Sequence, residues 1–220
     1  IDPVIKNTKK NKQIIFVGKL NESKGYDLFC EALFPILDKH TDWKAISVGD
    51  EKRFQHYNTH KRHINLGQIS HKKVLYFLSK SEIAAIPSRW EEPFGRTALE
   101  ATSRGCATII SSNGGLTETT DHAIILKKLS SKNLEHEINK LINNKTLRKN
   151  LQLNSQKNVK HKLSENSYKI DKMREALFPF SNFNTNNCKL RILNIYNMAQ
   201  KLNHRIYNLS LGKKFTNGFI

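Results

Sequence analysis

The chain has 220 residues, of which 38% are hydrophobic, and a formal net charge of +18, from 37 Lys and Arg against 19 Asp and Glu. Such a length suffices to bury a sizeable core, and no apolar run reaches the roughly 20 residues that a membrane-spanning helix needs. The positive charge could attract nucleic acid, anionic lipid or a phosphorylated substrate, although a Lys-rich surface also follows from biased base composition. Charge alone therefore does not identify a partner.

Strand-like and helix-like patterns alternate along most of the chain. The apolar, β-branched run at residues 14–18 predicts a buried strand, and the apolar stripe from 25 to 39 predicts a helix that is kinked or broken at Pro35. Further strands are expected at residues 43–49, 63–66, 83–86, 106–110 and 123–126. Further helices are expected at residues 71–80, 96–104, 131–143 and 145–177, with a short helix opening at 114–118.

This alternation implies parallel strands joined by right-handed crossovers. We therefore expect a doubly wound, Rossmann-like α/β sheet over residues 1–178, with its ligand at the carboxyl ends of the strands. Residues 179–220 contain no Asp or Glu and are predicted to form a basic, helical C-terminal extension. Ile1 is not an initiator Met, so we expect the chain to be part of a longer protein.

The cysteines and histidines form no pattern typical of a disulfide framework or a metal site. Cys30, Cys106 and Cys188 are scattered and form no Cys-x-x-Cys pair, so a reducing cytoplasm is expected. Cys30 and Cys106 have apolar neighbours, which favours buried, small hydrophobic side chains. His56 and His60 stand four residues apart in a very polar segment, and we interpret them as surface residues rather than metal ligands.

Two carboxylates bracket a Pro-Phe-Gly turn in the run 88–101, Ser-Arg-Trp-Glu-Glu-Pro-Phe-Gly-Arg-Thr-Ala-Leu-Glu-Ala. Glu92 precedes a helix that starts near Gly95, and Glu100 lies about 7–8 Å along its axis, at roughly 1.5 Å per residue. The free N–H groups and the dipole at the helix start favour a phosphate, and carboxylates accept hydrogen bonds from sugar hydroxyls. The run therefore predicts a site for a sugar attached to a diphosphate. The alternative is that Glu92 caps the helix and Glu100 is an exposed helix acid.

Three segments in chain order, residues 16–25, 92–101 and 111–118, each follow a predicted strand and together resemble a known family. From about Gln13 to Leu177 the chain is similar to the C-terminal, nucleotide-sugar-binding half of a retaining GT-B glycosyltransferase of the family-4 type (glycosyl transferases group 1). The resemblance implies one Rossmann-like half of a GT-B fold. It also implies a missing N-terminal domain that binds most of the acceptor.

The resemblance assigns the donor diphosphate to the loop Gly18-Lys-Leu-Asn-Glu-Ser-Lys-Gly25. In the family an Arg and a Lys of this loop, which opens at Gly18, hold the diphosphate and offset charge on the leaving nucleotide. Lys24 matches the family Lys. Lys19 stands where Arg is usual, which keeps the charge but loses the two-pronged geometry. The alternative for Lys19 is a solvated loop lysine.

The resemblance also gives roles to the residues around the Pro-Phe-Gly turn. Glu92 matches the carboxylate that hydrogen-bonds the donor sugar near the reacting carbon, and Glu100 matches the one that accepts from the ribose hydroxyls. The backbone N–H groups near Phe94, Gly95 and Thr97 are expected to approach the sugar and the phosphate.

Three further positions match the family less directly. Arg96 occupies a position that is usually apolar in the family, and it either points at the phosphates or lies on the surface. Gly67 and Gln68 match the loop that frames the base. The glycine pair at 114–115 matches a pair that precedes a helix in the family.

The implied reaction moves a sugar from a nucleotide diphosphate sugar to an acceptor hydroxyl with retention of configuration, in cell-surface polysaccharide or lipopolysaccharide synthesis. Lys19, Lys24 and the helix dipole balance the diphosphate, so no dedicated metal and no other cofactor are expected. One alternative is a nucleotide-sugar-binding module that is inactive without the missing domain. Another is a nucleic-acid-binding domain, against which stand the few aromatics among the basic residues and the lack of a known motif, so no nucleic acid partner is expected.

The basic extension has two interpretations. Residues from about Lys189 to Lys214 either lie on an anionic membrane surface, close to a lipid-linked glycan acceptor, or form a helix that packs on the domain or on the missing half. We expect a cytoplasmic protein, which in the first case is peripheral at the inner face of the membrane.

Overall fold

The computed structural model describes residues 9–177 with the exception of 52, 54–56 and 58. The chain divides into two units, Ile1–Leu163 and Ser164–Ile220, each described by itself. The first unit holds the sheet and its covering helices, and the described part of the second unit is helical. The basic extension at 179–220 lies outside the described residues, and so does Cys188; the boundary drawn from the sequence after residue 178 stays a prediction.

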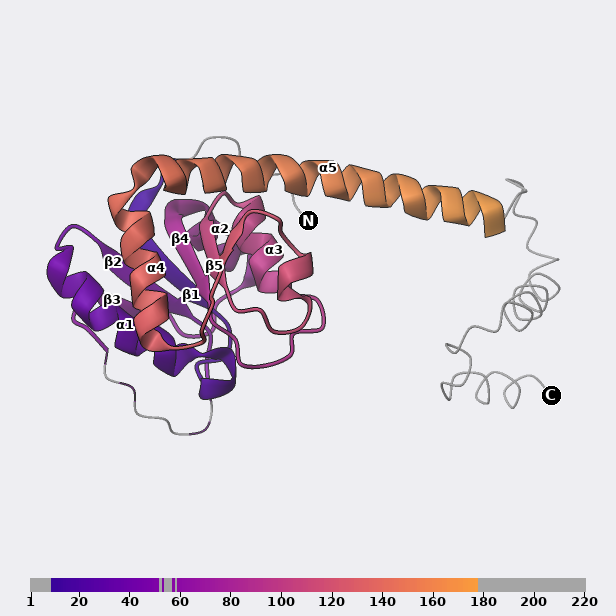
Figure 1. The fold of residues 1–220 in the computed structure, drawn as a ribbon. Helices are drawn as coiled ribbons and strands as arrows, with labels where there is room; N and C mark the ends of the chain where they lie inside the picture. The colour runs from indigo at the N-terminus through magenta and orange to yellow at the C-terminus, as the bar shows by residue number, and fades with distance from the viewer. Residues whose placement is uncertain (1–8, 52, 54–56, 58, 178–220) are drawn as a thin grey trace, which may run out of the picture. The chain divides into compact units, whose positions relative to one another are not determined.

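The sheet has six strands, and every pairing within it is parallel (Figure 1). The strand order is β3-β2-β1-β4-β5-β6, which is the doubly wound arrangement expected from the sequence. The strands are β1 Asn11–Val17, β2 Lys44–Val48, β3 His63–Asn65, β4 Ser81–Ile86, β5 Ala107–Ile110 and β6 Ala123–Ile125. The α-helices are α1 Tyr26–Lys39, α2 His71–Lys80, α3 Arg96–Ser103, α4 Ser131–Asn143 and α5 Lys145–Leu177. Two short 3-10 helices follow β1 and β5, at Glu22–Lys24 (η1) and Gly115–Glu118 (η2).

Side chains of the strands point alternately to two apolar layers, one on each face of the sheet. Ile14 and Phe16 of β1 pack with α1 and α4 on one face, whereas Ile15 between them packs with α2 and α3 on the other. Because both faces are covered, the central strands are continuous apolar runs rather than alternating ones, and such runs are typical of a parallel sheet. Cys30 and Cys106 are buried in these layers, as predicted.

The structure corrects two expectations about local structure. Helix α1 is not broken at Pro35 but continues through it, because Pro35 and Glu31 both lie on the exposed face, where water can satisfy the carbonyl that loses its N–H partner. His60 is buried, with 6% of its surface exposed, and its ring packs edge-on against Phe34 at a centroid distance of 5.8 Å. Its Nε2 lies 3.1 Å from Asp38 Oδ1, so a residue interpreted as part of a polar surface belongs to the packing of α1. His56 lies outside the described residues.

Among the described residues, no helix is both long and apolar enough to cross a membrane. Within the same residues, no three His, Cys, Asp or Glu side chains are grouped so that they could hold a metal ion.

Gly25 brings the loop after β1 into contact with the segment that follows β4. It links η1 to α1 with φ +72°, and a Cβ atom at this position would lie 1.9 Å from the carbonyl oxygen of Pro87. Only glycine allows both this left-handed backbone and this close approach. The backbones of the two loops are therefore in close contact at Gly25, without any side chain between them.

Replacing Gly25 by Ala tests this close approach, and Gly67 offers a matched control. Gly67 has a similar φ of +64°, but a Cβ there meets nothing within 4 Å. Gly67→Ala should cost about 1–2 kcal/mol of left-handed strain, whereas Gly25→Ala should cost about 2 kcal/mol more because of the overlap with the Pro87 carbonyl. Urea unfolding of the two variants measures the difference, and equal losses would show that the contact is not constraining.

His63, the first residue of β3, is buried among aromatic side chains. Its ring lies 5.6 Å from the Phe29 ring and 6.2 Å from the Tyr26 ring, and its Nε2 lies 3.1 Å from Ser47 Oγ. Burial opposes protonation and, with a smaller contribution from His60, lowers the pKa of His63 to about 4. Folding therefore depends on keeping this imidazole neutral.

The low pKa of His63 predicts a loss of stability in mild acid. An unfolded chain protonates this histidine near pH 6.5, so between about pH 6.5 and pH 4 the unfolded state binds more protons and the free energy of unfolding falls with pH. From about pH 7.5 to about pH 5 the loss from this group should be about 2 kcal/mol. Urea titrations of a His63→Phe variant should lack this part of the pH dependence, whereas the same change at exposed His136 should retain it.

Candidate functional site

Most of the residues singled out in the sequence gather at the carboxyl edge of the sheet, because all strands are parallel. The loop after β1 carries Gly18, Lys19 and Lys24, and the loop after β4 leads through Glu92 into α3. Gly49, after β2, approaches the first loop so closely that a Cβ atom there would lie 1.8 Å from the Gly18 carbonyl oxygen. The edge is thus a set of loops in direct backbone contact.

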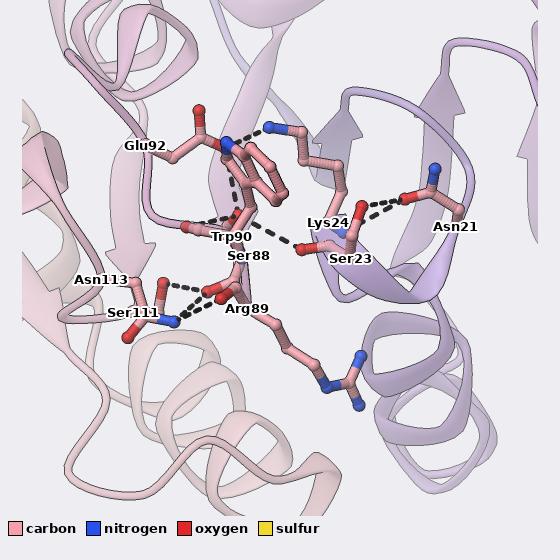
Figure 2. A network of polar contacts seen from close by, with 9 residues as sticks. All are labelled: Asn21, Ser23, Lys24, Ser88, Arg89, Trp90, Glu92, Ser111 and Asn113. Carbon is pink, nitrogen blue, oxygen red and sulfur yellow. Dashed lines mark hydrogen bonds and ion pairs between the residues drawn. The ribbon is translucent and has the colours of Figure 1, made fainter.

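Lys24 and Glu92 meet across this edge, although they are 68 residues apart in the chain (Figure 2). The Lys24 ammonium lies 2.5 Å from Glu92 Oε1, and both side chains are partly buried. The Asn21 side chain accepts a hydrogen bond from the Lys24 backbone N–H at 3.2 Å, which fixes the turn that presents the lysine. The structure therefore joins the two side chains to which the resemblance gives the diphosphate and the donor sugar.

Ser88, buried just after β4, holds Glu92 from the other side. Its hydroxyl lies 3.0 Å from Glu92 Oε1, the same oxygen that contacts Lys24. The Ser88 carbonyl accepts hydrogen bonds from Ser111 Oγ at 2.7 Å and from Asn113 Nδ2 at 3.1 Å (Figure 2). Ser111 and Asn113, which follow β5, thus orient Ser88, and Ser88 in turn orients Glu92.

The loops after β1 and β4 are also joined through Ser23 and Arg89. The Ser23 carbonyl accepts hydrogen bonds from the backbone N–H groups of Arg89, at 2.9 Å, and Trp90, at 3.0 Å. The Arg89 guanidinium forms a two-pronged ion pair with Asp27 of α1, at 2.7 and 2.6 Å. Such a two-pronged pair is geometrically specific. The backbone hydrogen bonds at Ser23 and this ion pair therefore fix the two loops, and with them the positions of Lys24 and Glu92, independently of the Lys24–Glu92 contact.

The glycine pair at 114–115 packs against the backbone of Glu92. The Gly115 N–H donates to the Glu92 carbonyl at 2.6 Å, and a Cβ atom at Gly114 would lie 2.5 Å from the Glu92 backbone nitrogen and oxygen. These two glycines therefore let the loop after β5 pack directly on the Glu92 backbone and fix its position.

Glu100 is a buried carboxylate, with 8% of its surface exposed, so the interpretation of an exposed helix acid is wrong. Its Oε1 lies 3.0 Å from His71 Nε2 and 3.4 Å from Arg96 Nε. The Arg96 side chain is 80% exposed, which places it on the surface beside Glu100. Glu92 and Glu100 have separate sets of partners.

Helix α3 begins without a side-chain cap. Its N-cap residue is Gly95, with φ +68°, and among the described residues it has no side-chain cap hydrogen bond. Glu92 therefore does not cap this helix, and the N–H groups near Thr97 remain available to an anion. Phe94 and Trp90 flank the turn and are 60% and 57% exposed.

The remaining predicted residues lie at the same edge but make fewer contacts. Lys19 is exposed, and within the part of the chain that the structure describes its side chain forms no hydrogen bond or ion pair. Gly67 lies after β3, where its N–H bonds to Asn65 Oδ1 at 2.9 Å and its carbonyl accepts from Gly49 N–H at 3.0 Å. Gln68 follows it and is exposed.

Sequence reasoning missed Ser88, His71 and Asn113. Ser88 follows a predicted strand by two residues, which is a usable signal at a carboxyl edge. Asn113 follows the next predicted strand by three residues and carries the same signal. His71 carries none, because its contact with Glu100 depends on how α2 meets α3.

Comparison with known proteins gives a consistent result. The family described as glycosyl transferases group 1 matches residues 1–158. A 2-deoxystreptamine N-acetyl-D-glucosaminyltransferase of Niallia circulans is 28% identical over 158 residues, covering 67% of this chain and 40% of that enzyme. The chain spans less than half the length of the curated relatives that it matches.

Solved structures share the fold. HepE of Anabaena, in complex with UDP-glucose, matches with a TM-score of 0.60 and 20% identity over 69% of this chain and 44% of that chain. The C-terminal domain of a group 1 family glycosyl transferase (LpcC) from Francisella tularensis matches with a TM-score of 0.62 and 22% identity, covering 73% of this chain and 95% of that chain. With the family match over residues 1–158 and the fold of a C-terminal GT-B domain, the chain belongs to the glycosyl transferases group 1.

Proposed function

We propose that this chain is the donor-binding half of a retaining glycosyltransferase, which transfers a sugar from a nucleotide diphosphate sugar to an acceptor hydroxyl. The observation that carries the proposal is the Lys24–Glu92 ion pair at the carboxyl edge, next to the uncapped start of α3. A cation, a helix N-terminus and a carboxylate together suit a ligand that is anionic at one end and rich in hydroxyls at the other. The UDP-glucose complex of HepE, which has the same fold, supports a ligand of this class.

Donor binding exchanges the partner of Lys24. The ammonium now contacts a single carboxylate oxygen, and a diphosphate offers it several anionic oxygens. Once Lys24 turns to the diphosphate, Glu92 keeps its hydrogen bond from Ser88 and becomes an acceptor for a sugar hydroxyl. Lys19 and the first-turn N–H groups of α3 add positive electrostatic potential around the diphosphate of the donor.

Glu100 is arranged to hold the ribose. His71 and Arg96 both contact its Oε1, which leaves Oε2 to accept from ribose hydroxyls. These two contacts fix the orientation of the buried carboxylate. Gly67 and Gln68 lie at the same edge and would frame the base.

The transfer step follows from these positions. As the bond from the anomeric carbon to the diphosphate lengthens, negative charge grows on the leaving oxygens, where Lys24, Lys19 and the α3 amides stabilise it. The acceptor hydroxyl attacks from the same face, and Glu92 stabilises the oxocarbenium-like carbon and its hydroxyls without forming a bond to it. Retaining glycosidases need two carboxylates about 5–5.5 Å apart, whereas here Glu100 is assigned to the ribose. The balance of charge requires no metal.

The acceptor side is proposed to lie in the part of the protein beyond this chain, since the chain spans less than half the length of its curated relatives. The isolated chain should therefore bind the donor without transferring the sugar.

A thermal-shift screen against UDP-, GDP-, ADP- and TDP-sugars tests the proposal, followed by Glu92→Gln with the best ligand. At about 100-fold above Kd the donor should raise Tm by about 5–10 °C. Glu92→Gln should keep or increase the affinity for the nucleoside diphosphate, because Lys24 is no longer paired with a carboxylate, and should lose the affinity added by the sugar. In the complete enzyme, turnover should fall by about 10²–10³.

Exposed Glu91 provides the matched control, since Glu91→Gln makes the same change of charge one residue away and should alter neither affinity. The assigned roles of Lys24 and Glu92 fail if Glu92→Gln weakens nucleotide binding as much as it weakens nucleotide-sugar binding.

Glu100→Gln tests the ribose assignment. Losing a charged acceptor should weaken nucleotide binding about tenfold or more, and the loss should vanish with a 2′,3′-dideoxy nucleoside diphosphate, which lacks the hydroxyls. Calorimetric titration of the unchanged chain and of the variant with both nucleotides measures the coupling free energy between the Glu100 carboxylate and the ribose hydroxyls. Exposed Glu118 serves as the control position, and an equal loss with both nucleotides would assign Glu100 a purely structural role.

A further inference from the structure

A cavity lies at the amino edge of the sheet, opposite the edge that carries Lys24 and Glu92. It has a volume of about 520 Å³ and is lined by residues just before β1, by Glu82 of β4, by the end of α3 and by the first turns of α5. All of these residues belong to the unit Ile1–Leu163. The volume is in the range of small-ligand sites, which run from roughly 300 to 1,000 Å³.

The lining of this cavity is strongly basic. Five cationic side chains contribute to it, from Lys9, Lys10, Arg104, Lys145 and Lys149. Glu82 is the single carboxylate among the lining residues, and Arg148 already binds it through its Nε. Within the described residues, no ion pair neutralises Lys9, Lys145 or Lys149, and all three are exposed.

Lys145 and Lys149 lie close together on α5, so their charges repel each other. Lys145 and Lys149 are four residues apart on one helix face, and like charges at that spacing destabilise a helix. Gln152 and Gln156 continue the same face and add amide groups to the lining. Gln152 Nε2 donates to the Glu82 carbonyl at 2.9 Å, so this face of α5 is fixed over the start of β4.

Lys10 is built into the wall of the cavity. Its ammonium donates to the carbonyl oxygens of Ser79 at 3.0 Å, Ser81 at 2.9 Å and Arg104 at 2.9 Å. Burial lowers the pKa of this lysine, and Glu82 nearby opposes that effect. Lys10 therefore holds α2, β4 and α3 together, and Arg104 is buried, with 4% of its surface exposed. The exposed cations that can meet an anion in the cavity are Lys9, Lys145 and Lys149.

We propose that this cavity is a second anion site, on the other edge of the sheet from Lys24 and Glu92, and that it binds a phosphate-bearing ligand between Lys9, Lys145 and Lys149. A multiply charged phosphate relieves the repulsion between the lysines and takes up hydrogen bonds from their ammonium groups. The phosphate can come from a soluble compound or from the headgroup of an anionic phospholipid. Leu153, a 55% exposed apolar residue in the same lining, contacts whatever carries the phosphate.

The test is an NMR titration of the full chain with pyrophosphate at constant ionic strength. Gly105 lines the cavity and reports on it, whereas Gly95 at the start of α3 reports on the opposite edge. In the unchanged chain the Gly105 amide should shift and saturate. In the double variant Lys145→Ala and Lys149→Ala, the Kd read at Gly105 should rise at least about tenfold, with the titration at Gly95 unaltered.

A matched double variant controls for net charge. Lys127→Ala and Lys128→Ala remove the same charge from an exposed pair after β6 and should leave the Kd at Gly105 unchanged. Ala is a stronger helix former than Lys, so the α5 variant should fold, which circular dichroism checks. Equal losses in both double variants, or no saturable shift at Gly105, would overturn the proposal.

A vesicle assay separates the two sources of phosphate. Phosphatidylcholine vesicles with and without phosphatidylglycerol are sedimented with each protein. Binding to the anionic vesicles that falls only in the α5 double variant supports a lipid headgroup as the ligand. A saturable pyrophosphate shift at Gly105 with the same vesicle binding in all three proteins supports a soluble phosphate compound.

Discussion

The parallel direction of every strand is the constraint from which the rest of the structure follows. It requires each connection to return to the other end of the sheet, which α1, α2 and α3 do after β1, β3 and β4, and it places the carboxyl ends of all the strands at one edge. The backbone there approaches itself closely, with Gly25 against Pro87 and Gly49 against Gly18. Segments that are remote in the sequence are thereby brought into contact, and Lys24 reaches Glu92.

The Lys24–Glu92 contact is itself a modest source of stability, since ion pairs with partial access to solvent contribute about 0–1 kcal/mol. The surrounding frame is stronger, because it consists of backbone hydrogen bonds at Ser23 and the two-pronged Arg89–Asp27 ion pair. The site therefore combines a rigid backbone with a charge pair that separates at little cost. This combination suits a ligand that must take one partner away from the other without reorganising the loops.

The sequence predicted the architecture well, because buried parallel strands appear as short apolar runs and every run except the one at 43–49 was followed by a helical pattern. It also singled out Lys24, Glu92 and Glu100 through motif and spacing. It did not predict that Glu92 would be paired with Lys24 or Glu100 with His71, since such contacts depend on three-dimensional packing. The errors have the same origin: His60 and Pro35 were judged by local polarity and local propensity, whereas the packing of α1 decided both.

The lengths of the strands have a consequence for association with other chains. Central β1 has seven residues, whereas β3 and β6, at the two margins of the sheet, have three each. A margin this short presents few open backbone donors and acceptors, so a foreign strand finds little to add to. The short edge strands therefore protect the sheet from edge-to-edge aggregation, even though Ile64 and Ile125 on those strands are exposed.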